Sequence, residues 1–541
     1  MKLGIIYNLI GLYTGVLGSK LKGSEKPLNI AMSMGIGSRS HIKFLLEITQ
    51  QLSDRGHKIT FLSLDGFESF VKGYNITFQS VGSISMGVGS VFQLTPFKRG
   101  DPFNKGIVDV DKLVYNVYSN TFKNFEKYYE ESKPDLIICD WCNPSCFDSA
   151  AKHSVPMMIG YQTLTPIAES FHTISLGLEP STIEDYSFIK RLDHTFIEPW
   201  RQWYEHYPLK MKLKRAKQEN GVPAHIGLEW TNYGLGIAHS YVGYENSRNT
   251  PSHVIPVGPV FSDKIDPLTP DKVIYVGFGS LTQLQPELSE GMLKHFHKLL
   301  EHNWIDGVIW GGMANTNLKK FPKKYTVDGM EFPTKSILDG THQQIKLLKW
   351  APQRSILNHP STKLFLTHGG LDSIYESINS ATPMIILPFL GDQPRNAVLI
   401  KENGIGDYLE WDDDSEIQTY SKFFNLLNPD NIQLQQNLEH HQLMNQLSSQ
   451  RKTFGANLIE TYAKSAKSCR SENPQTAFDI PCELKPYIPL DRRTSFLKSH
   501  LVDVYLFALM VAILSVGFIL MGVYKLLMRF NSLSYEKKKV E

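Results

Sequence analysis

Two short glycine-containing segments in the second half of the chain could hold an anion. Gly277-Phe278-Gly279-Ser280 and Thr367-His368-Gly369-Gly370 each follow an apolar run that predicts a β-strand, and each precedes a helical pattern. Glycine lets the backbone approach a phosphate closely, and the N-terminus of a helix attracts negative charge. His368 adds a hydrogen-bond donor, or a positive charge when it is protonated. Either segment alone is also typical of a tight turn.

The first half of the chain contains a histidine and a carboxylate that could work as a pair. His41 stands near the start of a predicted helix, directly after a predicted strand, and Asp140 ends another predicted strand. Both side chains are therefore expected at the carboxyl edge of one sheet. An imidazole with a pKa of about 6.5 accepts a proton near neutral pH, and a carboxylate on its other nitrogen fixes the tautomer. A surface or helix-capping role is the alternative for each residue.

Alternating strand and helix patterns run through both halves and would position these residues. The predicted strands are residues 28–33, 58–64, 135–140 and 156–160 in the first half, and 272–276, 307–310, 344–349, 364–367 and 383–387 in the second. This alternation predicts parallel, doubly wound sheets and the α/β class. Residues 251–270 contain five prolines, which predicts an extended linker between two domains that face each other across a cleft.

Length and composition agree with this organisation. The chain has 541 residues, of which 42% are hydrophobic and 20% are charged. These values are typical of a globular protein with more than one core. The formal net charge is +2, and no basic patch is interleaved with aromatic residues, so nucleic-acid binding is not expected.

A longer string in the second half is much more specific than either glycine segment. Its members are, in order, Trp350-Ala351-Pro352-Gln353, His359-Pro360, Thr367-His368-Gly369-Gly370, Glu376, Pro383, Pro388 and Asp392-Gln393. In order and spacing, from about Lys349 to Gly406, the string resembles the signature of the UDP-glycosyltransferases. The membrane signals described below make the chain similar to the endoplasmic-reticulum branch of that family.

The resemblance implies a donor site in the second half of the chain. The indole of Trp350 would stack on the uracil, Gln353 would bond in the nucleoside region, and Glu376 would accept hydrogen bonds from the ribose hydroxyls. Asp392 and Gln393 would bind hydroxyls of the transferred sugar.

The diphosphate of the donor would be held by Ser280 and His368, together with the backbone at Gly279 and Gly370, which would stabilise the charge that grows as UDP leaves. One position departs from the family pattern, because Asp372 stands where Asn or Ser is frequent. An anion there would repel the diphosphate unless it points away or caps the helix, so the resemblance assigns no phosphate role to it.

The resemblance also implies a fold and a reaction. The fold is GT-B, with two facing Rossmann-like domains. His41 would deprotonate the acceptor, Asp140 would support it, and the sugar would be transferred with inversion to a hydroxyl of a small lipophilic acceptor such as a sterol, a lipid or a phenol. UDP-glucose is the favoured donor and UDP-glucuronate the other candidate, for which Arg395 is a nearby cation in the sequence. The UDP-sugar is a co-substrate, so no cofactor is expected.

A metal-dependent donor site is the rival arrangement. Asp109-Val110-Asp111 and Asp412-Asp413-Asp414 have the Asp-x-Asp pattern that binds a divalent cation. Both occur in polar surroundings and are expected to be solvated charge. A diphosphate site built on helix ends and His368 requires no metal.

Both ends of the chain carry membrane signals. Residues 1–19 have a short basic start, an apolar stretch and small residues, as in a signal peptide. Val504 to Val523 contains no charge and no proline, which is enough to span a bilayer as a helix. More Lys and Arg follow this segment than precede it, so the tail is expected in the cytosol and the domains in the lumen. Lys538-Lys539 matches a dilysine retrieval signal, which predicts a single-pass type I protein of the endoplasmic reticulum.

Three further features bear on the environment of the chain. Asn75-Ile76-Thr77 is a glycosylation sequon, which is usable in the lumen. Cys139, Cys142 and Cys146 are expected to be buried or free thiols, whereas pairing of Cys469 with Cys482 is left open. The aromatic residues around Trp200 indicate core packing, an acceptor pocket or a surface that rests on the bilayer.

The predicted organisation is a signal peptide (1–19), an acceptor-binding domain (25–250), a linker (251–270), a UDP-sugar-binding domain (271–465), a juxtamembrane segment (466–500), a transmembrane helix (501–527) and a cytosolic tail (528–541). The partners expected are a UDP-sugar, a lipophilic acceptor and the bilayer, with self-association left open. Two alternatives remain. The chain could be a catalytically silent UDP-sugar-binding protein of the membrane, or a dolichol- or ceramide-directed enzyme on the cytosolic face.

Overall fold

The computed structural model describes most of the chain. The described residues are 26–37, 39–83, 95–98, 107–164, 177–179, 186–222, 234–245, 250–261, 272–279, 282, 284–313, 318, 321–412, 414–472, 480–488 and 496–540. The expected signal peptide and Ser280 lie outside these ranges.

A parallel sheet of seven strands forms the centre of the first domain. Its order is β3-β2-β1-β4-β5-β6-β7, with β1 (Asn29–Ser33), β2 (Lys58–Ser63), β3 (Thr77–Ser80), β4 (Leu136–Asp140), β5 (Met157–Tyr161), β6 (Leu235–Ala238) and β7 (Val254–Pro256). The central strands β4 and β5 are buried at every residue. Continuous apolar strands of this kind are expected where helices cover both faces of a parallel sheet.

A second parallel sheet of six strands forms the centre of the second domain. Its order is β12-β9-β8-β13-β14-β15, with β8 (Val273–Gly277), β9 (Gly307–Trp310), β12 (Ile345–Leu347), β13 (Thr362–Thr367), β14 (Met384–Ile386) and β15 (Gly406–Tyr408). A separate antiparallel hairpin pairs β10 (Lys324–Val327) with β11 (Met330–Pro333). The two parallel sheets confirm the predicted α/β class and the doubly wound arrangement.

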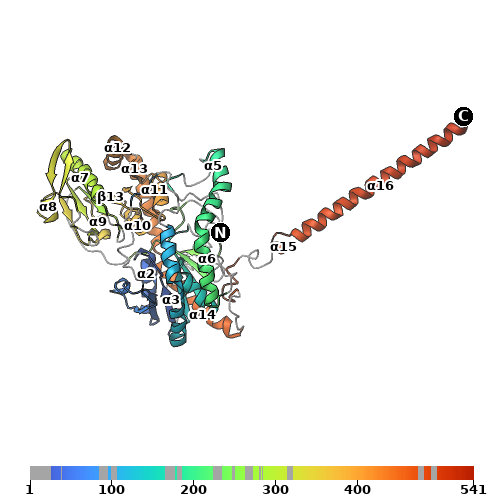
Figure 1. Cartoon of the computed structure of the whole chain (residues 1–541), viewed down its shortest axis with the longest axis horizontal. Helices are drawn as coiled ribbons and strands as arrows, with labels where there is room; N and C mark the ends of the chain where they lie inside the picture. Colours follow the sequence, from blue (N-terminus) through green and yellow to red (C-terminus); the bar gives the residue numbers. More distant parts are fainter. Residues whose placement is uncertain are drawn as a thin grey trace, which may run out of the picture.

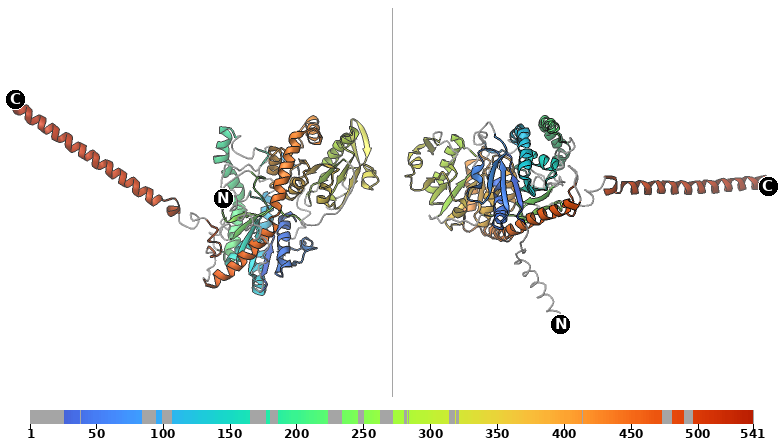
Figure 2. Two further views of the ribbon diagram at one scale, coloured as in Figure 1. Left: turned by 180° about the vertical axis from the view of Figure 1, so that it is seen from behind. Right: turned by 90° about the horizontal axis from the view of Figure 1, so that it is seen from below.

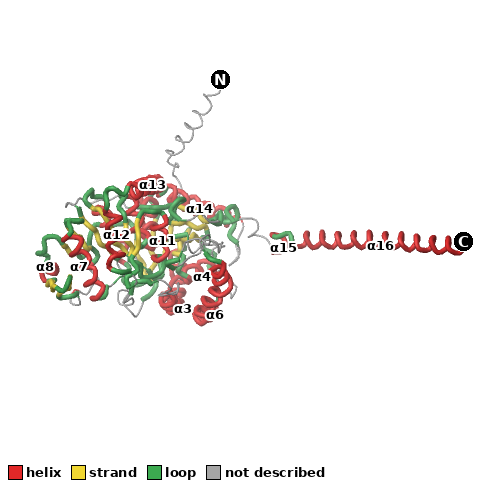
Figure 3. The backbone as a smooth tube through the Cα atoms, turned by 90° about the horizontal axis from the view of Figure 1, so that it is seen from above, coloured by secondary structure: helices red, strands yellow, loops and turns green. Residues whose placement is uncertain are grey.

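Helices surround both sheets (Figures 1 and 3). They are α2 (Ser40–Asp54), η2 (Glu68–Val71), α3 (Ile107–Ser132), α4 (Pro144–Lys152), α5 (Phe188–Leu192), η7 (Asp193–Ile197), α6 (Glu198–Glu219), α7 (Pro286–Glu301), α8 (Lys335–Leu338), α9 (Gln353–Leu357), α10 (Leu371–Asn379), α11 (Gln393–Glu402), α12 (Glu416–Leu427), α13 (Ile432–Ser449), α14 (Lys452–Glu472), α15 (Phe496–Ser499) and α16 (Val502–Val540). Figure 3 shows α3, α4 and α6 gathered on one side of the molecule.

Two segments join the first domain although the sequence predicts them elsewhere. Strand β7 lies within the range 251–270 that predicts an extended linker, and it pairs with β6. Helix α14 follows the second domain in sequence but packs against α2 of the first domain (Figure 2). Ile459 and Tyr462 of α14 share one apolar core with Ile30 of β1. The chain therefore returns to the first domain before it reaches the C-terminal helix.

The C-terminal helix α16 projects away from the two domains (Figure 1). Its stretch Val502–Arg529 has 28 residues, a mean hydropathy of 2.7 and no burial in the structure. Among the described residues this is the one helix long and apolar enough to cross a membrane, by length and composition.

The aromatic segment near Trp200 is not part of a core. Trp200 is 70% exposed on α6, and Phe188, Phe196 and Tyr204 are also exposed on α5, η7 and α6. Core packing of these residues is therefore excluded, whereas an acceptor pocket and a lipid-facing surface stay open as interpretations.

Four of the cysteines form disulfides. Cys139 at β4 is joined to Cys146 in α4, and Cys469 in α14 is joined to Cys482. The first bond corrects the expectation that Cys139 and Cys146 are thiols, and the second gives the pairing that the sequence left open. Cys142 takes part in neither disulfide.

Candidate active site

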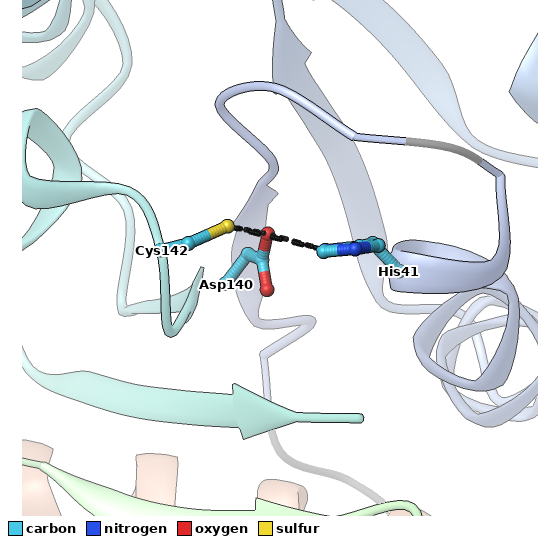
Figure 4. A group of neighbouring side chains, drawn as sticks. All are labelled: His41, Asp140 and Cys142. Carbon is cyan, nitrogen blue, oxygen red and sulfur yellow. Dashed lines mark hydrogen bonds and ion pairs between the residues drawn. The ribbon is translucent and has the colours of Figure 1, made fainter. Parts of the chain in front are cut away.

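His41 and Asp140 lie together where the strand order of the first sheet reverses. Strands β1 and β4 are neighbours, His41 is the second residue of the helix after β1, and Asp140 is the last residue of β4. His41 Nδ1 is 3.4 Å from Asp140 Oδ2 (Figure 4). The Asp140 side chain is fully buried, while that of His41 is 31% exposed. Open α/β sheets bind their ligands at such a reversal point.

Gln162, which sequence reasoning missed, fixes the orientation of this pair. Its Nε2 donates to Asp140 Oδ1 at 2.8 Å and to the carbonyl oxygen of His41 at 2.7 Å. Trp141 Nε1 donates in turn to Gln162 Oε1. Because Gln162 occupies Oδ1, the second carboxylate oxygen Oδ2 is the one that faces His41. The position of Gln162, directly after β5 and beside β4, was the available sequence signal.

The pKa of His41 is raised above its usual value. Burial is the largest influence and works to lower the pKa, but the hydrogen bond and charge of Asp140 outweigh it. The charges of Asp392 and Asp372, from the second domain, add to the increase. Acidic groups of both domains thus favour a proton on this imidazole.

The second sheet brings its two glycine segments together at its own reversal point. Strands β8 and β13 are neighbours, Gly279 follows β8 and His368 follows β13. A Cβ atom added to Gly279 would lie 2.8 Å from His368 Nε2, and one added to Gly370 would lie 2.5 Å from it. The two glycines therefore enclose the imidazole so closely that neither position has room for a side chain.

His368 is neutral near pH 7. Burial lowers its pKa to about 4, and a hydrogen bond with the Gly277 backbone only partly opposes this change. The sequence left a positive charge open for His368; the structure supports the neutral donor instead. Ser280, the other expected diphosphate ligand, lies outside the described residues.

Two of the residues that the sequence predicts to bind the nucleoside, Gln353 and Glu376, are in direct contact. Gln353, the first residue of α9, donates through Nε2 to Glu376 Oε2 at 3.0 Å and to Ser373 Oγ at 3.1 Å. Glu376 and Ser373 lie on α10, so a side chain of α9 ties the two helices together. Trp350 is 72% exposed, so its indole is accessible to a flat ligand.

Asp392 and Gln393 lie at the start of α11. Asp392 Oδ2 accepts a hydrogen bond from Asn396 Nδ2 at 2.9 Å, and burial raises the pKa of this carboxyl group. Gln393 Oε1 accepts from the backbone N–H groups of Phe389 and Leu390 at 2.9 and 3.2 Å. The amide oxygen of Gln393 thus holds the preceding loop, which leaves its amide nitrogen as the group that could reach a ligand.

Lys43 crosses from the first domain to the second, a contact that the sequence did not indicate. Its Nζ lies 2.7 Å from Glu376 Oε1 and 3.9 Å from Asp372 Oδ2. Asp372 also faces His239 Nδ1 at 3.5 Å. The departure from the family pattern at Asp372 therefore has a structural reason. Its carboxylate points toward the first domain, where it faces Lys43 and His239. Burial raises the Asp372 pKa to about 6, and the positive charge of Lys43 opposes this increase.

A second ion pair between the domains is buried. Arg395 Nη1 donates to Glu245 Oε2 at 3.1 Å, and each side chain is only 3% exposed. Glu245 Oε1 accepts from Ser240 Oγ at 3.0 Å and from the Leu164 N–H at 3.1 Å. Arg395 is thus committed to a carboxylate of the first domain.

The Asp-x-Asp segments do not form a shared carboxylate site in the part of the chain that the structure describes. Asp412 pairs with Lys98, and Asp414 pairs with Lys422 at 2.6 Å. Asp414 is largely buried in this pair, so it is not the solvated charge that the sequence suggested. Asp413 and the side chains of Asp109 and Asp111 lie outside the described residues.

Comparison with known proteins finds similarity to UDP-glycosyltransferases. Residues 328–442 match the family model described as "UDP-glucoronosyl and UDP-glucosyl transferase". A UDP-glycosyltransferase of Talaromyces amestolkiae is 25% identical over 502 residues, which cover 85% of this chain and 91% of that protein. UDP-glucuronosyltransferase 3A1 of Mus musculus is 44% identical over 62 residues, 12% of each chain.

Solved structures support the same fold. The crystal structure titled as the glycotransferase of kitacinnamycin superposes with a TM-score of 0.58 and 17% identity, covering 81% of this chain and 99% of that one. This likeness and the two facing parallel sheets confirm the GT-B fold.

Proposed function

Because the chain belongs to the UDP-glycosyltransferase family and is a glycosyltransferase that uses a UDP-sugar, we propose that it transfers a hexose with inversion to a hydroxyl of a small lipophilic acceptor. The observation that carries this proposal is the His41–Asp140 pair at 3.4 Å, held by Gln162 at the reversal point of the first sheet. Asp392 of the second domain acts electrostatically on His41, which supports a donor sugar located between the two.

The proposed reaction is a single displacement. Nδ1 of His41 faces Asp140, so Nε2 is the nitrogen that takes the proton of the acceptor hydroxyl. The acceptor oxygen attacks the anomeric carbon as the bond from that carbon to the diphosphate breaks, and UDP leaves with the bonding electrons. Asp140 stabilises the imidazolium that forms.

The donor would bind to the second domain. The face of Trp350 would stack on the uracil, and Gln353 would bond to the nucleoside. Neutral His368, Ser280 and the backbone at Gly279 and Gly370 would hold the diphosphate. Glu376 accepts from Lys43 in this structure, so the ribose hydroxyls would compete with Lys43 for the carboxylate.

A neutral hexose, with UDP-glucose as the favoured donor, is proposed over glucuronate. A glucuronate carboxylate needs a cation, and Arg395 is the one that the sequence placed near Asp392 and Gln393. Its buried pair with Glu245 argues that Arg395 holds the domains together. The hydroxyls of the sugar would instead be bound by Asp392 and the amide nitrogen of Gln393.

A location in the endoplasmic-reticulum membrane, with the domains in the lumen, completes the proposal. Helix α16 would be the single span, and the exposed aromatic residues around Trp200 would lie against lipid or lipophilic acceptor. Asn75, the proposed glycosylation site, is exposed. Both disulfides are of the kind that persists in an oxidising compartment.

The test is release of UDP by the full chain in detergent. UDP-glucose, UDP-glucuronate, UDP-galactose and UDP-N-acetylglucosamine are offered in turn with a pool of lipophilic alcohols. We expect acceptor-dependent release that is fastest with UDP-glucose. Faster release with UDP-glucuronate would contradict the donor assignment, and no release despite measurable UDP binding would contradict catalysis.

A further inference from the structure

Three side chains with different metal-binding atoms converge beside the proposed catalytic histidine. Cys142 Sγ lies 2.9 Å from Asp140 Oδ2 and 3.9 Å from His41 Nδ1, and His41 Nδ1 lies 3.4 Å from Asp140 Oδ2 (Figure 4). All three atoms lie within 4.8 Å of one another. We propose that His41, Asp140 and Cys142 form an inhibitory site for a thiophilic divalent cation, with zinc as the ion that fits best.

The spacing of the three atoms is close to that of zinc ligands. Zinc bonds of about 2.0–2.1 Å to nitrogen and oxygen and about 2.3 Å to sulfur, at tetrahedral angles, place N and O about 3.4 Å apart and S about 3.6 Å from either. The structure has 3.4 Å for the N–O pair and 3.9 and 2.9 Å for the pairs with sulfur. To complete the geometry, the half-buried Cys142 sulfur would move about 0.7 Å away from Asp140 Oδ2 and about 0.3 Å closer to His41 Nδ1.

The surroundings favour a cation at this point. Gln162 donates to Asp140 Oδ1, which leaves Oδ2 directed at the site, and such outer hydrogen bonds orient metal ligands. The carboxylates of Asp392 and Asp372 add negative potential at His41. The His41 side chain is 31% exposed and that of Cys142 is partly exposed, so solvent reaches two of the three ligand residues.

Only one cysteine of this neighbourhood is available as a thiolate. Cys139 and Cys146 are joined in a disulfide. Among the described residues, the other group of three possible metal ligands is Cys469, Cys482 and Glu483. Its two cysteines are also joined in a disulfide. A disulfide sulfur is a poor ligand because the thiolate is the form that binds metal. Zinc binding at the proposed site releases the thiol proton of Cys142 to solvent.

Zinc at this site would stop the proposed reaction, and this part of the inference rests on the proposed function. Zinc takes the lone pair of His41 Nδ1, so the one proton of the neutral imidazole must reside on Nε2. Nε2 then has no lone pair to accept the acceptor proton, and Asp140 is held by the metal.

Metal binding is tested without reference to turnover. The full chain in detergent is titrated with Cd²⁺, whose bond to a thiolate gives an ultraviolet absorption band, and Zn²⁺ is then added as the competitor. One thiolate-bound Cd²⁺ per chain, displaced by Zn²⁺, is expected for the unaltered protein. The band should be absent in Cys142→Ser and Cys142→Ala and retained in His302→Ala, which removes an exposed histidine elsewhere. An unchanged band in both Cys142 variants would overturn the site.

Inhibition is tested on the same proteins by UDP release in buffered free Zn²⁺. Activity of the unaltered chain should fall with zinc and return with a chelator. Cys142→Ser removes one metal ligand, and it should raise the zinc concentration needed for inhibition at least about tenfold. Changing a residue that only hydrogen-bonds to a metal ligand already costs about that much in metal affinity. Turnover of Cys142→Ser in the absence of zinc should persist. Equal inhibition of Cys142→Ser would overturn the inference. A Cd²⁺ band that depends on Cys142 in a chain with no transferase activity would instead contradict the proposed function and leave the metal site standing.

Discussion

Replacing Asp140 with asparagine should disable the proposed base without disturbing donor binding. Gln162 Nε2 donates to one oxygen of Asp140, so the oxygen of the new amide must stay on that side. The amide nitrogen then takes the place of Oδ2 and donates to His41 Nδ1. His41 Nδ1 becomes an acceptor, its proton moves to Nε2, and the base loses the lone pair that it needs.

The magnitude follows from that tautomer change. Loss of general-base catalysis costs about 10²- to 10⁴-fold, and a trapped wrong tautomer lies at the upper end. We expect kcat of Asp140→Asn to fall about 10³- to 10⁴-fold, which corresponds to about 4–5.5 kcal/mol in the activation free energy. UDP affinity should be unchanged because the residues proposed to bind the donor lie on the second domain.

The assay measures UDP release at saturating donor and acceptor, with UDP affinity measured by calorimetry on the same preparation. Gln162→Ala serves as the matched variant, since it removes the hydrogen bond from Gln162 to Asp140 that Asp140→Asn keeps, but leaves the carboxylate beside His41. Its kcat should fall much less than that of Asp140→Asn. A kcat for Asp140→Asn within tenfold of the unaltered enzyme would refute the reasoning.

Three other changes have defined outcomes. The value of kcat/KM should rise with pH through the pKa of His41, because only the neutral imidazole accepts a proton. Asp140 raises this pKa. A midpoint of the pH profile below about 6.5, the ordinary imidazole value, would therefore contradict the assignment of His41 as the base. Trp350→Ala should weaken UDP binding by about 1–3 kcal/mol through lost base stacking. The unfolding temperature should not fall, since the indole is 72% exposed. Calorimetry measures the change in UDP affinity, and thermal denaturation measures the change in stability. Arg395→Met should destabilise the protein by about 3–5 kcal/mol because it leaves Glu245 charged and buried, and the double variant with Glu245→Gln should recover part of that loss in chemical denaturation.

The strands and the positions of the proposed site residues could be predicted because they depend on local patterns. Apolar runs identify β4 and β13, and the residue that ends or directly follows each such strand lies at the carboxyl edge. Asp140 and His368 could therefore be placed from the sequence. Strand β7 was mistaken for linker because it lies in a proline-rich segment and ends at Pro256, and a proline is also tolerated in an edge strand, where a missing N–H costs nothing.

The contacts between distant residues were not predictable in the same way. Lys43 and Glu376 are 333 residues apart, and Arg395 and Glu245 are 150 apart. No spacing rule relates positions on two separate domains, so these pairs follow from how the domains meet. The sequence also left the protonation of His368 open, because its low pKa depends on burial of the imidazole in the folded chain.

Exposure of the aromatic segment could not be settled by composition. Trp200 and Tyr204 have the residue types of a core, and they lie on a helix whose faces the sequence pattern does not separate. Only the tertiary packing of α6 shows that these side chains remain uncovered.

The central claim, that His41 is the base of a UDP-sugar transferase, is tested most directly with His41→Ala. UDP release with the preferred donor and acceptor is measured beside UDP affinity. The account predicts that transfer is abolished while UDP binds with unchanged affinity. Undiminished turnover of His41→Ala would contradict it.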